Sequence, residues 1–294
     1  MQVLQSLSID NWESPKLDRD INIANLLELG HVICLPKLCF PLHPDESELI
    51  SPEFSDGVAK NISLDSNNNQ LKGFVDKNNT VLVNAFKKLL ERYASESYSL
   101  ITKLIPLYKN KLEFGRTSFR PVEIEGRKAP SYRKDDTRLH VDAFPANPNQ
   151  GKRILRVFCN IHPHGKPRCW RVGTPFSEVA YTFLPKIKQP FVLSRQLLKL
   201  LHITKSDRTP YDHIMLNIHD LMKKDIIYQQ TVPYTEIHFP ALSTWIVFTD
   251  SVSHAALSGQ HVLEQTFYLD VENMQNPSLS PLKILEQYTG LSLV

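Results

Sequence analysis

The chain has 294 residues, of which 41% are hydrophobic and 22% are charged, as is typical of a soluble globular protein. Its 10 glycines and 20 prolines argue against a glycine-rich nucleotide-binding fold, and no apolar run is long enough to predict a membrane-spanning helix. The net charge is only +3 and no nucleic-acid-binding motif is present, so we expect no nucleic-acid partner. The 4 cysteines form no Cys-x-x-Cys pair and the N-terminus carries no secretory signal, which predicts a cytoplasmic protein.

The N-terminal part of the sequence shows little periodicity. Prolines and polar residues interrupt short apolar runs through residues 1–80, which predicts an irregular N-terminal extension. Apolar residues then recur with helical spacing over residues 80–110, with a break at Pro106, and predict a supporting helical region. Two further helical patterns cover residues 193–201 and 212–224.

Three short segments rich in β-branched and aromatic residues predict strands at residues 153–161, 243–248 and 262–269. The last two flank residues 258–260, a turn signal that predicts a hairpin. Strands separated by long, partly helical connections favour a mainly β fold with helical additions, of the β-sandwich or jelly-roll type. Because the sequence shows no internal repeat and no linker, we expect a single domain over residues 1–294.

Histidines beside carboxylates are the side chains with the clearest potential for chemistry. His140 and Asp142 are two residues apart, a spacing that places both side chains on one face of an extended chain. A second His-x-Asp pair, His43 and Asp45, lies among prolines in an acidic segment. We favour His140 and Asp142 as metal ligands because a predicted strand and a run of basic residues follow them.

His254 is the candidate for a third ligand, because it lies just ahead of the last predicted strand. Together the three residues would form the two-histidine, one-carboxylate triad of non-heme Fe(II) oxygenases. His261, beyond the turn, is the main alternative to His254. Such a triad leaves metal positions for a bidentate 2-oxo acid and for O2, so we expect 2-oxoglutarate as a co-substrate.

The distal carboxylate of 2-oxoglutarate requires a cation. No basic residue lies within residues 262–266, so the cation must come from a part of the chain that does not directly follow His254. Arg156 lies between Ile154 and Phe158 on one face of a predicted strand, and a buried charge at that position is costly unless it is paired. The sequence therefore predicts that Arg156 either binds an anion, which we favour, or forms an ion pair.

Several stretches, in order between about residues 115 and 270, resemble the Kdo 3-hydroxylase family. They are LHVDAFPANP at residues 139–148, GKRILRVFCNIHP at 151–163, RCWRVG at 168–173, PYDHIMLNIHD at 210–220 and SVSHAALSGQ at 251–260. The resemblance implies a double-stranded β-helix (jelly-roll) core and an Fe(II)/2-oxoglutarate-dependent dioxygenase. It implies hydroxylation at C3 of Kdo (3-deoxy-D-manno-oct-2-ulosonic acid) on a lipid A precursor, which gives the sugar Ko in lipopolysaccharide inner-core biosynthesis.

The resemblance also implies which residues form the site. The expected catalytic iron ligands are His140, Asp142 and His254. The residues expected to bind 2-oxoglutarate are Arg120, Arg156, Arg168 and Trp170, with Arg116 as the near neighbour that competes with Arg120 for a place in the site.

A Kdo-bearing lipid A precursor as partner predicts peripheral contact with the cytoplasmic face of the inner membrane. Basic residues of the acid-free run 152–171 are the candidates for this contact, namely Lys152, Arg153, Lys166 and Arg171. Two alternatives stay open: an Fe(II)/2-oxoglutarate oxygenase acting on another small molecule or on a protein, and a non-enzymatic, cupin-like metal-binding module.

Overall fold

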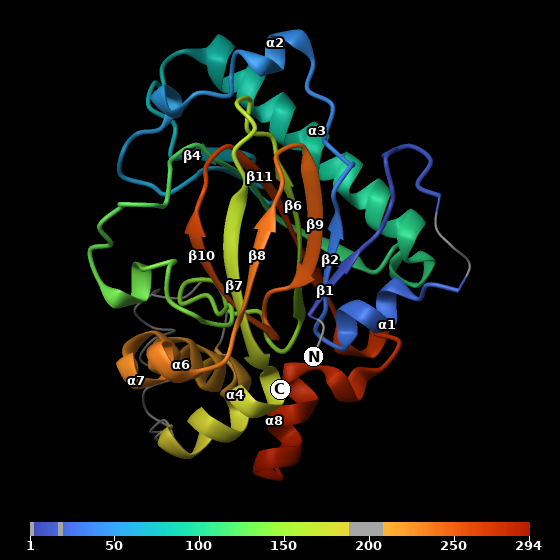
Figure 1. Cartoon of the computed structure of the whole chain (residues 1–294), viewed down its shortest axis with the longest axis vertical. Helices are drawn as coiled ribbons and strands as arrows, with labels where there is room; N and C mark the ends of the chain where they lie inside the picture. The colour runs from blue at the N-terminus through green and yellow to red at the C-terminus, as the bar shows by residue number, and fades with distance from the viewer. Residues whose placement is uncertain (1–2, 17–19, 188–207) are drawn as a thin grey trace.

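The computed structural model describes residues 3–16, 20–187 and 208–294 of the chain. Within these residues two β-sheets lie face to face, and α3 crosses the outer face of the larger sheet (Figure 1). In order across the larger, eight-stranded sheet, its strands are β1 Leu4–Ser6, β2 Val32–Leu35, β9 Ser243–Phe248, β6 Arg153–Asn160, β11 Val262–Leu269, β5 Leu112–Arg120, β3 Ile62–Asp65 and β4 Gln70–Lys72. The smaller sheet contains β10 Val252–Ser258, β7 Arg168–Pro175 and β8 Thr235–Phe239.

Strand β6 shows how the larger sheet separates two cores. All of its residues are buried, and successive side chains point to opposite faces. Leu155, Val157 and Cys159 join the apolar core beneath the helices, whereas Phe158 packs with Trp170 and Trp245 in the core between the sheets. The alternation that placed Arg156 on the side of Phe158 therefore directs its guanidinium toward the space between the sheets.

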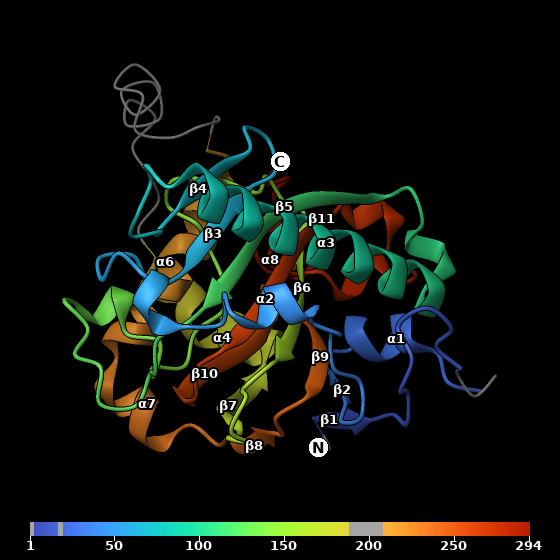
Figure 2. The same ribbon diagram turned by 90° about the horizontal axis from the view of Figure 1, so that it is seen from above.

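Helix α3 (Thr80–Leu104) is the longest element of the described chain and covers the larger sheet, as Figure 2 shows from above. The side chain of Asn79 caps its first turn by accepting the N–H of Leu82 at 3.1 Å. The helix ends before Pro106, which cannot continue the hydrogen-bonding pattern. The Tyr93 hydroxyl donates to the carbonyl of Val157 at 3.1 Å and ties the helix to β6. The predicted helical region with its break is confirmed.

The remaining α-helices of the described residues are shorter than α3. Four of them gather at one end of the sheets (Figure 1): α4 Phe176–Phe183, α6 Pro210–Lys224, α7 Ile226–Thr231 and α8 Pro281–Thr289. Among the described residues, α1 Ile23–Glu28 and α2 Pro44–Ser47 are the other two. Short 3-10 helices are Pro52–Phe54, Pro106–Tyr108, Tyr132–Lys134, Leu184–Lys186, Val271–Asn273 and Pro277–Leu279. Helix α6 confirms the helical pattern at 212–224, while the pattern at 193–201 lies outside the described residues.

Residues 1–80 contain more regular structure than the sequence indicated, since β1, β2, β3 and β4 all join the larger sheet. These strands have only three or four residues each, which is too short to produce a recognisable alternation. The chain nevertheless combines a mainly β sandwich with helical additions, which agrees with the predicted fold class and with a jelly roll. The extent of a single domain over residues 1–294 stays a prediction.

The predicted hairpin is wrong. β9 pairs with β2 and β6, and the turn at residues 259–261 connects β10 of the smaller sheet to β11 of the larger one. A turn signal indicates where the chain reverses, but it does not indicate whether the two flanking strands share a sheet. No helix of the described residues is long and apolar enough to cross a membrane.

Candidate metal centre

His140, Asp142 and His254 meet because the segment that carries the first two pairs with β10. The His140 N–H donates to the His254 carbonyl at 3.0 Å, and the His254 N–H donates to the His140 carbonyl at 2.8 Å. The Asp142 N–H donates to the carbonyl of Thr249 at 2.8 Å. On the other side, the Gln229 side chain of α7 accepts the N–H of the residue before His140 and donates to its carbonyl, at 2.8 and 2.9 Å.

One ligand atom from each of the three side chains lies within 4.8 Å of the other two, and all three residues are buried. The Nδ1 atoms of His140 and His254 lie 2.8 Å from the carbonyls of Arg138 and Val252, two residues earlier in each case. A carbonyl can only accept, so each Nδ1 carries the proton and each Nε2 keeps its lone pair for a metal. Within the described residues this is the only group of three or more such side chains close enough to share an ion.

The protonation states of these side chains suit a cation. Burial lowers the pKa of His140 well below its ordinary value, with further contributions from Lys223 and His254, and burial likewise lowers the pKa of His254. Burial alone would raise the pKa of Asp142, but the Arg156 guanidinium and His254 outweigh it and hold this pKa below its ordinary value. The cluster therefore offers two neutral imidazoles and one carboxylate.

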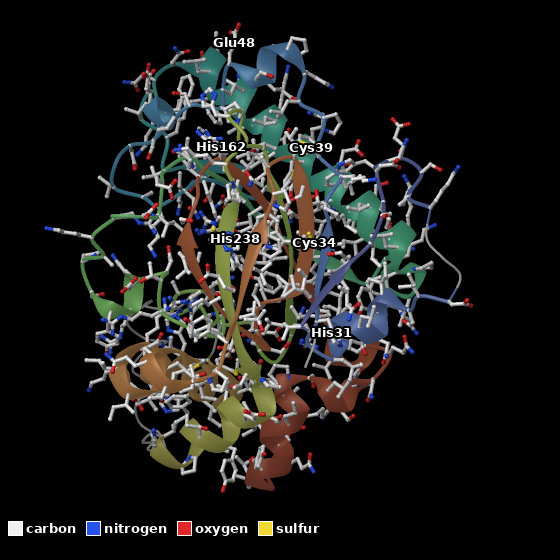
Figure 3. All side chains as sticks on the ribbon, in the orientation of Figure 1. His31, Cys34, Cys39, Glu48, His162 and His238 are labelled. Atoms are coloured by element: carbon white, nitrogen blue, oxygen red, sulfur yellow. The ribbon has the colours of Figure 1, made fainter. Side chains whose placement is uncertain are left out.

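The structure places the alternative histidines elsewhere. The His261 ring packs edge-on against that of His162, with centroids 4.9 Å apart. His162 lies at the end of the sheets nearer to α2 and away from α6 and α7 (Figure 3). His43 occupies the N-cap position of α2, and Asp45 is exposed in that helix. None of these four residues belongs to the metal-ligating group.

A cavity of about 430 Å³ opens beside the cluster, between the two sheets. It is lined by the three candidate metal ligands and by residues of β3, β5, β6, β7 and β11. The arginines and the tryptophan predicted to bind 2-oxoglutarate, Arg120, Arg156, Arg168 and Trp170, all line it, as does Arg116.

A chain of ion pairs crosses this cavity. Arg156 contacts the candidate ligand Asp142 at 3.0 Å and Glu264 of β11 at 2.7 Å. Glu264 also accepts the Nε–H of Arg120 at 2.6 Å. Arg156 is thus half of an ion pair here, the second of the two roles predicted for it, although its buried Nε has no hydrogen-bond partner among the described residues. Sequence reasoning missed Glu264, whose only signal was an acidic residue inside a predicted strand.

Arg168 has no carboxylate contact among the described residues. One Nη–H donates to the carbonyl of Gly259 at 2.5 Å, and the buried Nε has no partner. Burial, helped by the nearby Arg120, lowers the pKa of the guanidinium to about 9. The Trp170 ring stacks on His254 with centroids 4.9 Å apart, and its Nε1–H is also buried without a partner. These two donors and the Nε of Arg156 therefore lack an acceptor within the described part of the chain, as expected of a site that binds an anion.

Gly259 holds Arg168 in place through backbone geometry that other residues rarely adopt. Its φ of +103° lies in the region that favours glycine, and a Cβ there would lie 2.9 Å from Cδ of Arg168. The close approach of this turn brings the Gly259 carbonyl to the guanidinium.

The basic run at 152–171 is less exposed than its sequence indicated. Arg153 is completely buried and forms an ion pair with Asp250 at 2.6 Å, so its expected contact with a membrane is wrong. Lys152 forms an ion pair with Glu113, and the Arg171 guanidinium lies 4.5 Å from the centroid of the Tyr234 ring.

All 4 cysteines are free thiols in the structure.

Comparison with known proteins identifies the family. A family model described as 3-deoxy-D-manno-oct-2-ulosonic acid (Kdo) hydroxylase matches residues 11–292. The chain belongs to the Kdo hydroxylase family. The resemblance read from the sequence is thereby confirmed. No curated protein matched the chain.

Solved structures of a family member agree with this result. The cobalt(II) complex of the Kdo hydroxylase KdoO, a non-heme Fe(II) alphaketoglutarate-dependent dioxygenase, is 46% identical with a TM-score of 0.93, and the match covers 100% of this chain and 98% of that chain. The KdoO complex with alphaketoglutarate and Fe(III) is 45% identical with a TM-score of 0.92, with the same coverage. The complex with succinate and Fe(III) gives the same values as the alphaketoglutarate complex. The predicted class of Fe(II)/2-oxoglutarate-dependent dioxygenase is therefore confirmed, while the assignment of individual site residues stays a prediction.

Proposed function

We propose that this protein hydroxylates C3 of Kdo attached to lipid A, with Fe(II), 2-oxoglutarate and O2, and so forms Ko in the lipopolysaccharide inner core. The observation that carries the proposal is a buried cluster of two histidines and one aspartate, in a chain of the Kdo hydroxylase family. Beside it lies a guanidinium that lacks an anionic partner among the residues that the structure describes.

In this proposal the Nε2 atoms of His140 and His254 and the carboxylate of Asp142 hold Fe(II). Iron of this type, when bound, supplies the centre at which 2-oxoglutarate and O2 are consumed and a C–H bond is hydroxylated. The carbonyls that accept the Nδ1 protons fix the orientation of both imidazoles, and Arg156 holds the Asp142 carboxylate at 3.0 Å.

Arg168 and Trp170 bind the distal carboxylate of 2-oxoglutarate in this proposal, because their partnerless N–H groups point to a missing acceptor. A guanidinium buried without an anion is costly, and a carboxylate removes most of that cost. Arg156 completes the cationic wall through its Nε. Arg120 acts on the co-substrate site indirectly, because its guanidinium binds Glu264 and Glu264 in turn holds Arg156.

The substrate also defines where the protein would work. Acyl chains hold Kdo-bearing lipid A in the membrane, so we propose peripheral contact of this protein with the cytoplasmic face of the inner membrane. Because Arg153 is buried and Lys152 is paired with Glu113, Lys166 and Arg171 are the predicted residues of the basic run left for anionic headgroups, each adding about 1 kcal/mol at low salt. Sedimentation with vesicles of anionic or neutral lipid, at low and high salt, measures this contact.

The test of the reaction is mass spectrometry of Kdo-lipid A after incubation with the protein, Fe(II), 2-oxoglutarate and O2. We expect one added oxygen atom on a Kdo residue, with one succinate formed for each product. The His140→Ala variant should give neither. If 2-oxoglutarate is turned over while Kdo stays unchanged, the dioxygenase activity stands and the proposed substrate is wrong.

A further inference from the structure

The cavity extends past the candidate iron ligands along β5 and β11, toward the β3–β4 region. Along β5 the side chains of Arg116, Ser118 and Arg120 alternate onto the cavity side. In the pairing with β11, Ser118 lies opposite Glu264 and Arg120 lies opposite Val262. Arg116 lies in the other direction along β5, toward the end of β11 that carries Tyr268. Arg116 therefore stands apart from the ion pairs that involve Glu264.

The cations of this cavity differ in how firmly they are held. Arg120 and Arg156 share Glu264, and Lys60 contacts Asp136 at 2.6 Å. Arg116, in contrast, reaches a carboxylate of the described chain only through a long contact of 3.6 Å to Asp65, and half of its side chain is exposed. Among the described residues that line the cavity, Arg116 and Arg168 are thus the two arginines without a short contact to a carboxylate.

Tyr268 lines the same cavity as Arg116, Arg156 and the candidate metal ligand Asp142. Burial raises the pKa of its phenol, Asn147, Arg156 and Arg116 oppose this shift, and Asp142 adds to it. The Asn147 side chain donates to this hydroxyl at 3.3 Å. Gly115 leaves room for the ring, because a Cβ there would lie 3.0 Å from Cε2 of Tyr268 and 3.0 Å from a β11 carbonyl.

We propose that Arg116, assisted by the Tyr268 hydroxyl, binds the C1 carboxylate of the Kdo substrate and thereby presents C3 to the metal centre. The proposal rests on the proposed function. In Kdo, C1 and C3 are both bonded to C2, so the carboxylate lies directly beside the carbon that is hydroxylated. Its cation must therefore be close to the metal ligands and distinct from Arg168, which serves 2-oxoglutarate.

The two arginines without a close carboxylate then match the two carboxylates that need a cation during the reaction. Arg168 is fully buried, as suits a co-substrate that enters first and is enclosed. Arg116 is half exposed, as suits a large amphiphilic substrate that reaches the cavity from outside. Asp65 is the partner that Arg116 exchanges for the sugar carboxylate.

The experiment measures binding and turnover of Kdo-lipid A by the full-length Arg116→Gln protein. We expect a roughly 10- to 100-fold rise in the KM for Kdo-lipid A, from loss of a charge-assisted contact, and an unchanged KM for 2-oxoglutarate. Succinate should also form in excess over hydroxylated sugar, because a misplaced C3 uncouples the reaction. Equilibrium binding of the lipid to the cobalt(II)-loaded protein without O2 should weaken by the same factor.

Three controls separate recognition of the carboxylate from general effects. Arg116→Lys should recover part of the affinity, and Lys283→Gln, which removes a charge from the exposed Lys283–Glu286 pair on α8, should match the wild type. The methyl ester of the Kdo carboxylate should bind the wild type as weakly as the natural lipid binds Arg116→Gln, with no further loss in the variant.

The outcomes distinguish this inference from the proposed function. If the wild type hydroxylates Kdo and Arg116→Gln keeps its KM within twofold, the role of Arg116 is overturned and the function stands. If the wild type does not hydroxylate Kdo at all, the function fails and the carboxylate assignment fails with it.

Discussion

At the residue scale, the three candidate metal ligands are distinguished from the other histidines by their neighbours. Each imidazole of the cluster has its Nδ1 proton bound to a backbone carbonyl, whereas His162 and His261 pack against each other at 4.9 Å. Sequence reasoning found the cluster because His-x-Asp in an extended chain is a local pattern. It could not find Glu264, whose role depends on arginines of two other strands.

The first prediction concerns metal binding. His140→Ala, Asp142→Ala and His254→Ala should each weaken Fe(II) binding by at least tenfold and abolish turnover, because each removes one of the proposed protein ligands. Isothermal titration with cobalt(II) checks the affinity, and circular dichroism checks that the fold is intact. His43→Ala should behave like the wild type. Loss of metal binding in His261→Ala, with binding kept in His254→Ala, would refute the assignment.

The second prediction concerns Arg168. Arg168→Leu should weaken 2-oxoglutarate binding by about 2–5 kcal/mol while the metal still binds, because the anion loses its buried cation. Gly259→Ala should weaken it less, since its Cβ displaces the arginine without removing the charge. Trp170→Phe keeps a ring against His254 and loses the N–H, so a small decrease in affinity is expected. If all three variants bound 2-oxoglutarate as tightly as the wild type, the co-substrate would have to bind elsewhere.

At the scale of elements, the long helix α3 was predictable because its periodicity extends over many residues. The strands β6, β9 and β11 were predictable because they are rich in β-branched and aromatic residues. The strands of the first 80 residues were not, since three or four residues carry no period. The failed hairpin has a related cause: the jelly-roll connection between β10 and β11 crosses between sheets, and that is decided by packing rather than by the turn itself.

The third prediction concerns the junction of β5, β6 and β11. Glu264→Gln should destabilise the protein by about 3–5 kcal/mol, because the buried guanidinium of Arg156 and the partly buried guanidinium of Arg120 lose their shared carboxylate. Chemical unfolding measures the difference. Glu236→Gln on β8, which removes an exposed contact to His238, is the control and should cost less than about 1 kcal/mol. A similar small cost for both variants would show that Glu264 holds neither arginine.

At the scale of the whole molecule, the buried histidines make stability depend on pH. Burial, with His162 and His164 nearby, lowers the pKa of His261 from 6.5 to about 4, although Glu123 opposes the shift. Between these values the unfolded chain binds a proton that the folded protein excludes. The contribution to stability is therefore complete above about pH 6.5 and is lost as the pH falls toward 4.

The fourth prediction follows from this linkage. The free energy of unfolding should decrease between pH 6.5 and pH 4 in the wild type, and the decrease should be smaller in His261→Asn, which cannot take up the proton. Asparagine is chosen because the φ of +54° at this position is one that it tolerates. Urea unfolding at several pH values gives the slope. The exposed His238→Asn serves as control, and identical slopes for wild type and His261→Asn would contradict the account.

The central claim is that one cluster binds the metal and the adjoining arginine binds the co-substrate. A crystal structure of the protein with cobalt(II) and 2-oxoglutarate tests it most directly, through the anomalous signal of the metal and the density of the anion. We expect the metal on Nε2 of His140, Nε2 of His254 and the Asp142 carboxylate. The distal carboxylate of 2-oxoglutarate should lie about 3 Å from the nitrogens of Arg168 and Trp170. A metal bound at His162 and His261, or an anion that leaves the Arg168 side chain without contact, would contradict the account.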